Sequence, residues 1–336
     1  MEDAQKQEQV LEEHIAQGNI DDAVKALYDL IVYYAKAKNF LKAEELRERL
    51  MEVNSLALTE IIKSAEIIEA EKTASIDKKH QEIWQDLYDF LTKEEGNALY
   101  HALEKIDLDP DQSILTQGKT NNRLFFLDSG NLQITFKQEN ALEFVKKLGP
   151  GETAGQDTFF PISLCTTTAT TAGGVQIKYL PREKFDAISA SFPGFADKLE
   201  SYCRKKEGTP IEAILKNKEV ERRRHDRLKC SGKITCQLLN NEGKPLSSPF
   251  AGFIDDISKG GLSFSIKCSK KSTARMLLGR PAQLTLEMQI QDAPTKQQYI
   301  CQIVSLKHHM FTDYSVHVRF NKPLTEPQMT GLDVSV

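Results

Sequence analysis

The sequence lacks the features that mark secreted, membrane-spanning or metal-binding proteins. Its six cysteines are scattered through 336 residues without a C-x-x-C pair, which indicates neither a zinc site nor a disulfide framework. The N-terminus shows no basic-then-apolar signal, and no apolar run approaches the roughly twenty residues of a membrane span. We therefore expect a cytoplasmic protein that holds no metal or cofactor.

Short enzyme motifs are also missing. The chain has no phosphate loop of the G-x-x-x-x-G-K-[ST] form, no H-E-x-x-H, no nucleophile elbow and no paired carboxylates arranged for acid–base catalysis. Its histidines, among them His225 and His317, have no carboxylate or cysteine partner at ligand spacing. No helix-turn-helix that would read DNA is evident. These absences predict a protein that is not an enzyme and does not recognise DNA directly.

Charge is distributed unevenly along the chain. Residues 1–105 carry 13 Lys/Arg against 23 Asp/Glu, a balance of −10, whereas residues 216–233 carry 8 against 3, a balance of +5. The acidic N-terminal region argues against nonspecific nucleic-acid binding there. The basic segment suits an anionic ligand.

Residues 1–78 are predicted to form helices. Apolar residues recur at helical spacing from Ile20 to Tyr34, which gives one apolar stripe. The pattern repeats 20 positions later, and Asn19 and Asn39 precede the two runs as N-caps would. An amphipathic bundle or dimerisation stalk is favoured over a peptide groove of tetratricopeptide type. We expect these helices to contact a protein partner, and a homodimer stays open.

Residues 80–205 combine helices with short strands. An amphipathic helix is predicted from Ile83 to Leu91 and a helical stretch at 181–205. The turn motifs between the predicted strands are Gln117-Gly118, Ser129-Gly130 and Leu148-Gly149-Pro150-Gly151-Glu152. Their order resembles that of cyclic nucleotide-binding domains, which implies a β-roll with flanking helices.

The nucleotide-binding part of that family's pattern is altered here. The family's phosphate cassette reads F-G-E and, several residues later, an Arg. This chain has Ala154-Gly155-Gln156 at the first position, and no Lys, Arg or His lies between Lys147 and Lys178. A cyclic phosphate buried there would lack a cationic partner, which is energetically expensive. We expect the β-roll to act as a structural or coupling element, with cyclic mononucleotide binding as the alternative.

Two motifs in the C-terminal third suit a guanine dinucleotide. Arg223 and Arg227 form R-x-x-x-R, and Asp256, Ser258 and Gly261 form D-x-S-x-x-G. The guanidinium fork pairs with guanine O6 and N7 and can stack on the purine. Cationic side chains bind phosphates strongly, Asp and Ser supply an acceptor and a donor, and glycine permits a close approach of the backbone.

Both motifs resemble the signature of the PilZ domain, a bacterial receptor module for the second messenger cyclic di-GMP. The resemblance covers residues 219–336, after a linker at 206–222, and implies a small antiparallel β-barrel. One departure is the last strand, Ser-Val-His-Val-Arg-Phe ending at Phe320, where PilZ domains often carry a glycine before the aromatic residue. The residues that would bind cyclic di-GMP are Arg223, Arg227, Asp256, Ser258 and Gly261, with Arg222, Arg224 and Gly260 as further candidates.

Together these patterns predict a multidomain α+β protein with an N-terminal α-helical region, a central cyclic-nucleotide-binding-like β-roll and a C-terminal PilZ-like barrel. Its predicted function is to bind cyclic di-GMP and signal to a protein partner through a changed arrangement of its domains. Signatures of diguanylate cyclases and phosphodiesterases are absent, so the chain would read the messenger without making or degrading it. The alternatives are a ligand-independent scaffold and a dual sensor that also binds a cyclic mononucleotide at the β-roll.

Overall fold

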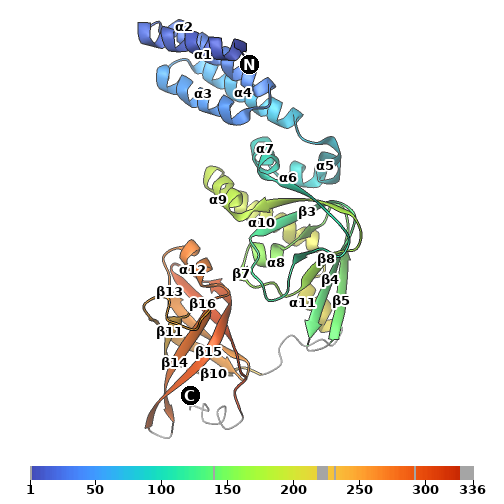
Figure 1. Ribbon diagram of the computed structural model, residues 1–336, viewed down its shortest axis with the longest axis vertical. Coiled ribbons are helices and arrows are strands. Elements are labelled where there is room, and N and C mark those ends of the chain that lie inside the picture. The colour runs from blue at the N-terminus through green and yellow to red at the C-terminus, as the bar shows by residue number, and fades with distance from the viewer. Residues whose placement is uncertain (1, 139–140, 218–225, 231, 291–292, 326–336) are drawn as a thin grey trace. The chain divides into compact units, whose positions relative to one another are not determined.

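The computed structural model describes residues 2–138, 141–217, 226–230, 232–290 and 293–325. By its internal contacts the chain divides into two compact units, Met1–Leu103 with Glu183–Tyr202, and Glu104–Arg182 with Cys203–Val336. Figure 1 colours the elements in chain order. No helix in the described part of the chain is long and apolar enough to cross a membrane.

The first unit is helical. Its helices are α1 (Glu2–Gln17), α2 (Ile20–Lys36), α3 (Phe40–Val53), α4 (Leu58–Ala74), α5 (Lys78–Ile83), α6 (Gln85–Phe90), α7 (Lys93–Ala102), α9 (Arg182–Ser191) and the start of α10 (Phe195–Glu207). Asn39 caps α3 by accepting a hydrogen bond from the Lys42 backbone N–H at 3.3 Å, whereas Asn19 stands at the N-cap of α2 without a side-chain bond. Both helices therefore begin where the repeated sequence pattern predicts.

The helix predicted from Ile83 to Leu91 is divided in the structure. Helix α5 ends at Ile83 and α6 begins at Gln85, while Trp84 between them has φ −109° and ψ 22°. The Trp84 side chain is fully buried. Tertiary packing of the largest side chain thus overrides a helical periodicity that the sequence carries through this point.

The β-roll in the second unit consists of two four-stranded sheets, ordered β1-β9-β3-β6 and β2-β8-β4-β5. Its elements are β1 (Glu104–Leu108), β2 (Ser113–Leu115), β3 (Arg123–Ser129), β4 (Leu132–Gln138), β5 (Ala141–Leu148), β6 (Thr153–Ala154), α8 (Gln156–Phe159), β7 (Ile162–Ser163), β8 (Thr168–Thr171) and β9 (Val175–Pro181). Inward residues such as Leu127, Ile134 and Ile177 form its core, and Leu215 of α11 (Ile211–Asn217) joins them.

The C-terminal barrel is closed by six antiparallel strands. Its elements are β10 (Leu228–Lys229), β11 (Lys233–Leu238), β12 (Phe250–Ser258), β13 (Gly261–Lys267), α12 (Lys271–Leu277), β14 (Pro281–Ile290), β15 (Ala293–His308) and β16 (Asp313–Phe320). The order β12-β11-β14-β15-β16-β13 closes because β12 also pairs with β13, and short β10 adds to β12. Alternate residues such as Ile234, Phe264, Leu284 and Val316 point inward and are buried.

One strand of the β-roll extends the ladder of the barrel. Strand β14 begins at Pro281 opposite Gln302, so it does not pair with the rest of β15. In the part of β15 that follows Gln302, β7 is the pairing strand, with Ser163 opposite Ser305 and Ile162 opposite Leu306. The Leu164 backbone N–H also donates to the Val304 carbonyl at 3.0 Å. Strand addition satisfies these backbone groups, and the Ile162 side chain, 3% exposed, belongs to the barrel's core.

Candidate ligand-binding site

An arginine and a carboxylate from the two C-terminal motifs meet on the barrel surface. Strand β10 pairs with β12 so that Lys229 lies opposite Asp256, which brings Arg227 beside that carboxylate. The Arg227 Nη1 donates to both carboxylate oxygens of Asp256, at 3.1 and 3.2 Å. The side chains are 40% and 24% exposed. Such a solvent-accessible pair contributes about 0–1 kcal/mol, so a ligand can compete for either partner.

The remaining motif residues form the tight turn between β12 and β13. Ser258 pairs with Gly261 across the turn, and its hydroxyl donates to the Gly261 carbonyl at 3.0 Å. A Cβ on Gly261 would lie 2.0 Å from the Val318 carbonyl oxygen of β16. The glycine therefore has a packing reason independent of any ligand, and the hydroxyl of Ser258 already serves the turn. Gly260 lies at the turn itself.

His317 lies in the same row of cross-strand neighbours. Asp256 pairs with Ser263, Ser263 with His317, and His317 with Ser305. Burial lowers the pKa of His317 below its ordinary value, and the positive charge of Arg227 lowers it further, while Asp256 and Asp255 act in the opposite direction. The spacing of residues in the sequence predicts no carboxylate partner for this histidine. The fold brings it close enough to Asp255 and Asp256 for their charges to act on it.

The β-roll's counterpart of a nucleotide cassette is compact. Gly155 has φ +89°, and a Cβ there would lie 2.8 Å from Asn121 Nδ2. The Gln156 side chain is buried, and its Oε1 accepts no hydrogen bond from the residues that the structure describes. A cation is nevertheless nearby, because the Arg182 guanidinium lies 3.6 Å from the centroid of the Phe159 ring in α8. Residues 148–177 contain no cation, but Arg182, which follows them in the sequence, contacts this segment at Phe159.

Comparison with known families identifies the barrel. Residues 221–334 match the model of the PilZ domain, and residues 105–192 match that of the cyclic nucleotide-binding domain. The chain contains a PilZ domain. The β-roll that precedes it is a cyclic nucleotide-binding domain. Both families are ligand-binding and non-catalytic.

Solved structures resemble the chain over part of its length. A cyclic nucleotide-binding domain from Methylobacillus flagellatus is 14% identical, with 42% of this chain and 82% of that chain covered and a TM-score of 0.38. The regulatory subunit of a cAMP-independent protein kinase A from Trypanosoma brucei is 14% identical, with 45% and 53% covered and a TM-score of 0.37. This chain thus spans about half of that subunit. No curated protein matches the chain.

The predicted PilZ ligand residues divide into two groups. Arg227, Asp256, Ser258 and Gly261 lie together around β12 and the turn that follows it, with Gly260. Arg222, Arg223 and Arg224 lie outside the described residues. The assignment of all eight to cyclic di-GMP stays a prediction.

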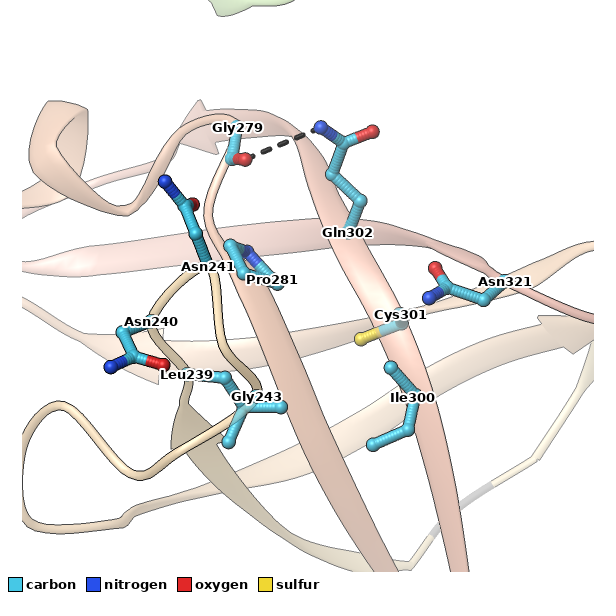
Figure 2. A pocket seen from close by; sticks show the side chains of 10 residues that line it. All are labelled: Leu239, Asn240, Asn241, Gly243, Gly279, Pro281, Ile300, Cys301, Gln302 and Asn321. Atoms are coloured by element: carbon cyan, nitrogen blue, oxygen red, sulfur yellow. Dashed lines mark hydrogen bonds between the residues drawn. The ribbon is translucent and has the colours of Figure 1, made fainter.

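A separate pocket of about 450 Å³ opens elsewhere on the PilZ barrel. Figure 2 shows its lining, in which the Gln302 Nε2 donates to the Gly279 carbonyl at 3.3 Å. Other lining side chains include Leu239, Asn240 and Asn321. None of the predicted ligand residues that the structure describes lines it. Among the described residues there is also no group of three side chains suited to hold a metal ion.

Proposed function

We propose that this chain is a receptor for cyclic di-GMP that binds the dinucleotide at its PilZ barrel. The observation that carries the proposal is the meeting of Arg227 and Asp256, from two motifs separated in sequence, beside the β12–β13 turn. Asp256 engages the guanidinium through Nη1 alone. The other N–H groups make no hydrogen bond within the described residues, so they suit guanine O6 and N7 or a phosphate oxygen.

The weak resting ion pair leaves both partners available to a ligand. The part-exposed Arg227–Asp256 pair contributes about 0–1 kcal/mol, and a bidentate arginine contact discriminates guanine from another base by about 1–3 kcal/mol. The Asp256 carboxylate can accept hydrogen bonds from the N–H edge of guanine while Arg227 contacts phosphate or purine. Arg223, four residues before Arg227, would supply the second cation that two phosphates require.

We propose that ligand binding is signalled by a change in the contacts between the β-roll and the barrel. The row of cross-strand pairs that starts at Asp256 continues through Ser263, His317 and Ser305 and ends at Ser163 in β7. A ligand that binds better to one arrangement of this row shifts the population toward it. The N-terminal helices would pass the change to a protein partner.

Calorimetry on the full chain tests the receptor. Cyclic di-GMP should give saturable heat, whereas GTP and cyclic di-AMP should give much less. Asp256→Asn should weaken binding at least several-fold, because it removes the charge that holds Arg227. Asp111→Asn, at an exposed position of the β-roll, is the matched control. An absence of heat from a folded chain would instead favour the ligand-independent scaffold.

Hydrogen exchange tests the output separately. Cyclic di-GMP should change the protection of amides at 162–164, whose ladder partners lie on β15. If cyclic di-GMP binds without changing the protection of these amides, the proposed signal through β7 is wrong. The proposal that the chain is a cyclic di-GMP receptor would still stand.

A second candidate function, cyclic mononucleotide binding at the β-roll, is favoured by one observation. Arg182 brings a guanidinium against α8, where the sequence alone supplies no cation. A saturable rise in melting temperature with cAMP or cGMP would support it.

A further inference from the structure

One end of the barrel presents apolar side chains to solvent. Phe311 is 90% exposed and Met310 is 78% exposed, both in the turn between β15 and β16, and Met276 on α12 is 67% exposed. The turn lies beside the segment after β13, since the Cys268 N–H donates to the Thr312 carbonyl at 2.7 Å. We call residues 267–276 and 307–313 the basic–apolar tip.

The turn holds Phe311 outward in a conformation that costs energy. Its φ is +59°, in the left-handed region that disfavours every residue with a Cβ. The conformation is pinned by His308 Nε2, which donates to the Phe311 carbonyl at 2.9 Å, and by the His309 N–H, which donates to Asp313 O at 2.8 Å. Burial usually compensates such strain in a bulky residue. Here the ring is almost fully exposed, so burial of the side chain does not compensate the strain.

Cations surround these apolar side chains. The basic–apolar tip contains five Lys/Arg and one Asp, together with two histidines. Lys267, Lys270 and Lys307 are exposed and form no ion pair with the described residues. Long lysine stems can lie along an apolar surface while their ammonium groups reach anionic groups beside it.

The tip is remote from the candidate cyclic di-GMP site. Strand β13 runs past both, since Asp256 of the site pairs with Ser263, whereas Lys267 of the tip pairs with Asp313. Four residues of strand separate Ser263 from Lys267, which corresponds to about 13 Å. Figure 1 likewise places α12 and β10 toward opposite ends of the barrel. The barrel pocket of Figure 2 has no lining residue in the tip either.

We propose that the basic–apolar tip docks the protein on an anionic phospholipid bilayer. A projecting turn with an aromatic and a methionine, ringed by lysines, matches a surface that offers negative headgroups above an apolar interior. A peptide partner is bound in a groove or at a free strand edge, whereas a projecting turn with exposed lysines suits the flat surface of a bilayer. Membrane contact would also bury Phe311 and so compensate its strained backbone.

Vesicle sedimentation with the full chain tests this proposal. The protein should bind vesicles with about 30% phosphatidylglycerol in phosphatidylcholine, and not pure phosphatidylcholine, because anionic lipid attracts the lysines. Raising the salt to about 0.5 M should reduce binding, since it screens that attraction. Phe311→Gly should weaken binding at least about fivefold, because the apolar anchor is lost. The same change should preserve or raise the melting temperature, because glycine adopts positive φ freely.

Charge and aromatic controls complete the test. Lys267→Glu, Lys270→Glu and Lys307→Glu together should abolish vesicle binding. The control carries Lys63→Glu, Lys205→Glu and Lys322→Glu together, which change the net charge by the same amount at exposed positions outside the tip. This control should retain more vesicle binding than the triple tip variant. Phe253→Ser removes another phenylalanine of the barrel that is 64% exposed and should leave binding unchanged. The proposal is overturned if the full chain ignores anionic vesicles, or if the tip variants bind as well as their controls.

Discussion

At Arg227 the geometry of the guanidinium matters as well as its charge. Arg227→Lys keeps the cation but loses the planar fork and the stacking surface, so cyclic di-GMP affinity should fall about tenfold or more. Arg280→Lys, also exposed on the barrel, should bind as the parent does. Calorimetry on both variants measures the difference. Equal affinities would show that Arg227 acts as a point charge or not at all.

His317 should make the stability of the barrel depend on pH. Because its pKa is lowered in the folded state, the unfolded chain binds more protons between that value and the ordinary one of about 6.5. Stability is therefore lost as pH falls through this window and is unaffected above it. Between about pH 7.5 and about pH 5.5 the parent should lose more melting temperature than His317→Gln does. Parallel losses would mean that His317 is not the sensitive group.

Gly261 should prove essential to the barrel whether or not ligand is present. In Gly261→Ala the new Cβ would need to displace the Val318 carbonyl, which should cost about 1–3 kcal/mol or more. Gly173→Ala is the control, because no atom lies within 4 Å of its added Cβ. Thermal unfolding without ligand should separate the two. If Gly261→Ala leaves the melting temperature unchanged, packing does not require this glycine. Its role would then be to let the backbone lie close to the ligand.

Some site residues could be read from the sequence and others could not. R-x-x-x-R and D-x-S-x-x-G are local patterns, so Arg227 and Asp256 could be predicted as neighbours of one ligand. The field around His317 depends on the register of β13 and β16 with β12, which no local pattern records. The same register explains why Gly261 fits only as glycine. Long-range strand pairing is thus the information that the sequence patterns lacked.

At the scale of elements, strands with clean alternation were predictable. The apolar alternation at 234–238 and 314–320 corresponds to β11 and β16. Strand β12 is harder to predict because its Asp and Ser favour a turn, and the turn follows the strand at Lys259 and Gly260. Strand β7 has two residues, too few for any periodicity, and forms because a partner is present. Its existence is a property of the pairing rather than of its own sequence.

The contribution of β7 to the barrel can be measured. Ile162→Ala removes most of a side chain that is 3% exposed and should cost about 2–5 kcal/mol. It should also speed hydrogen exchange of amides at 303–306 in β15. Ile62→Ala, at a position 56% exposed in α4, should change neither. Undisturbed exchange in the Ile162 variant would show that β15 is stable without β7.

At the scale of the whole molecule, cyclic di-GMP should stabilise the chain and cyclic mononucleotides should not. Cyclic di-GMP at about 100 times its dissociation constant should stabilise the chain by about 2.7 kcal/mol. We expect cAMP to give no such shift, because Gln156 replaces the family's carboxylate and residues 148–177 contain no Lys, Arg or His. Thermal melts of the full chain with each nucleotide compare them directly. A saturable shift with cAMP would make the chain a dual sensor.

The pairing of β7 with β15 limits how such a protein can evolve by exchange of modules. A barrel cut from this chain would carry an unfilled gap at the Ile162 position, and its Val304 carbonyl would lose the Leu164 amide. Open strand edges of this kind recruit other chains and promote aggregation. If a barrel from another protein replaced this one, β7 would have no matching strand edge with which to pair. We therefore expect a chimera to need both sides of the ladder from one parent.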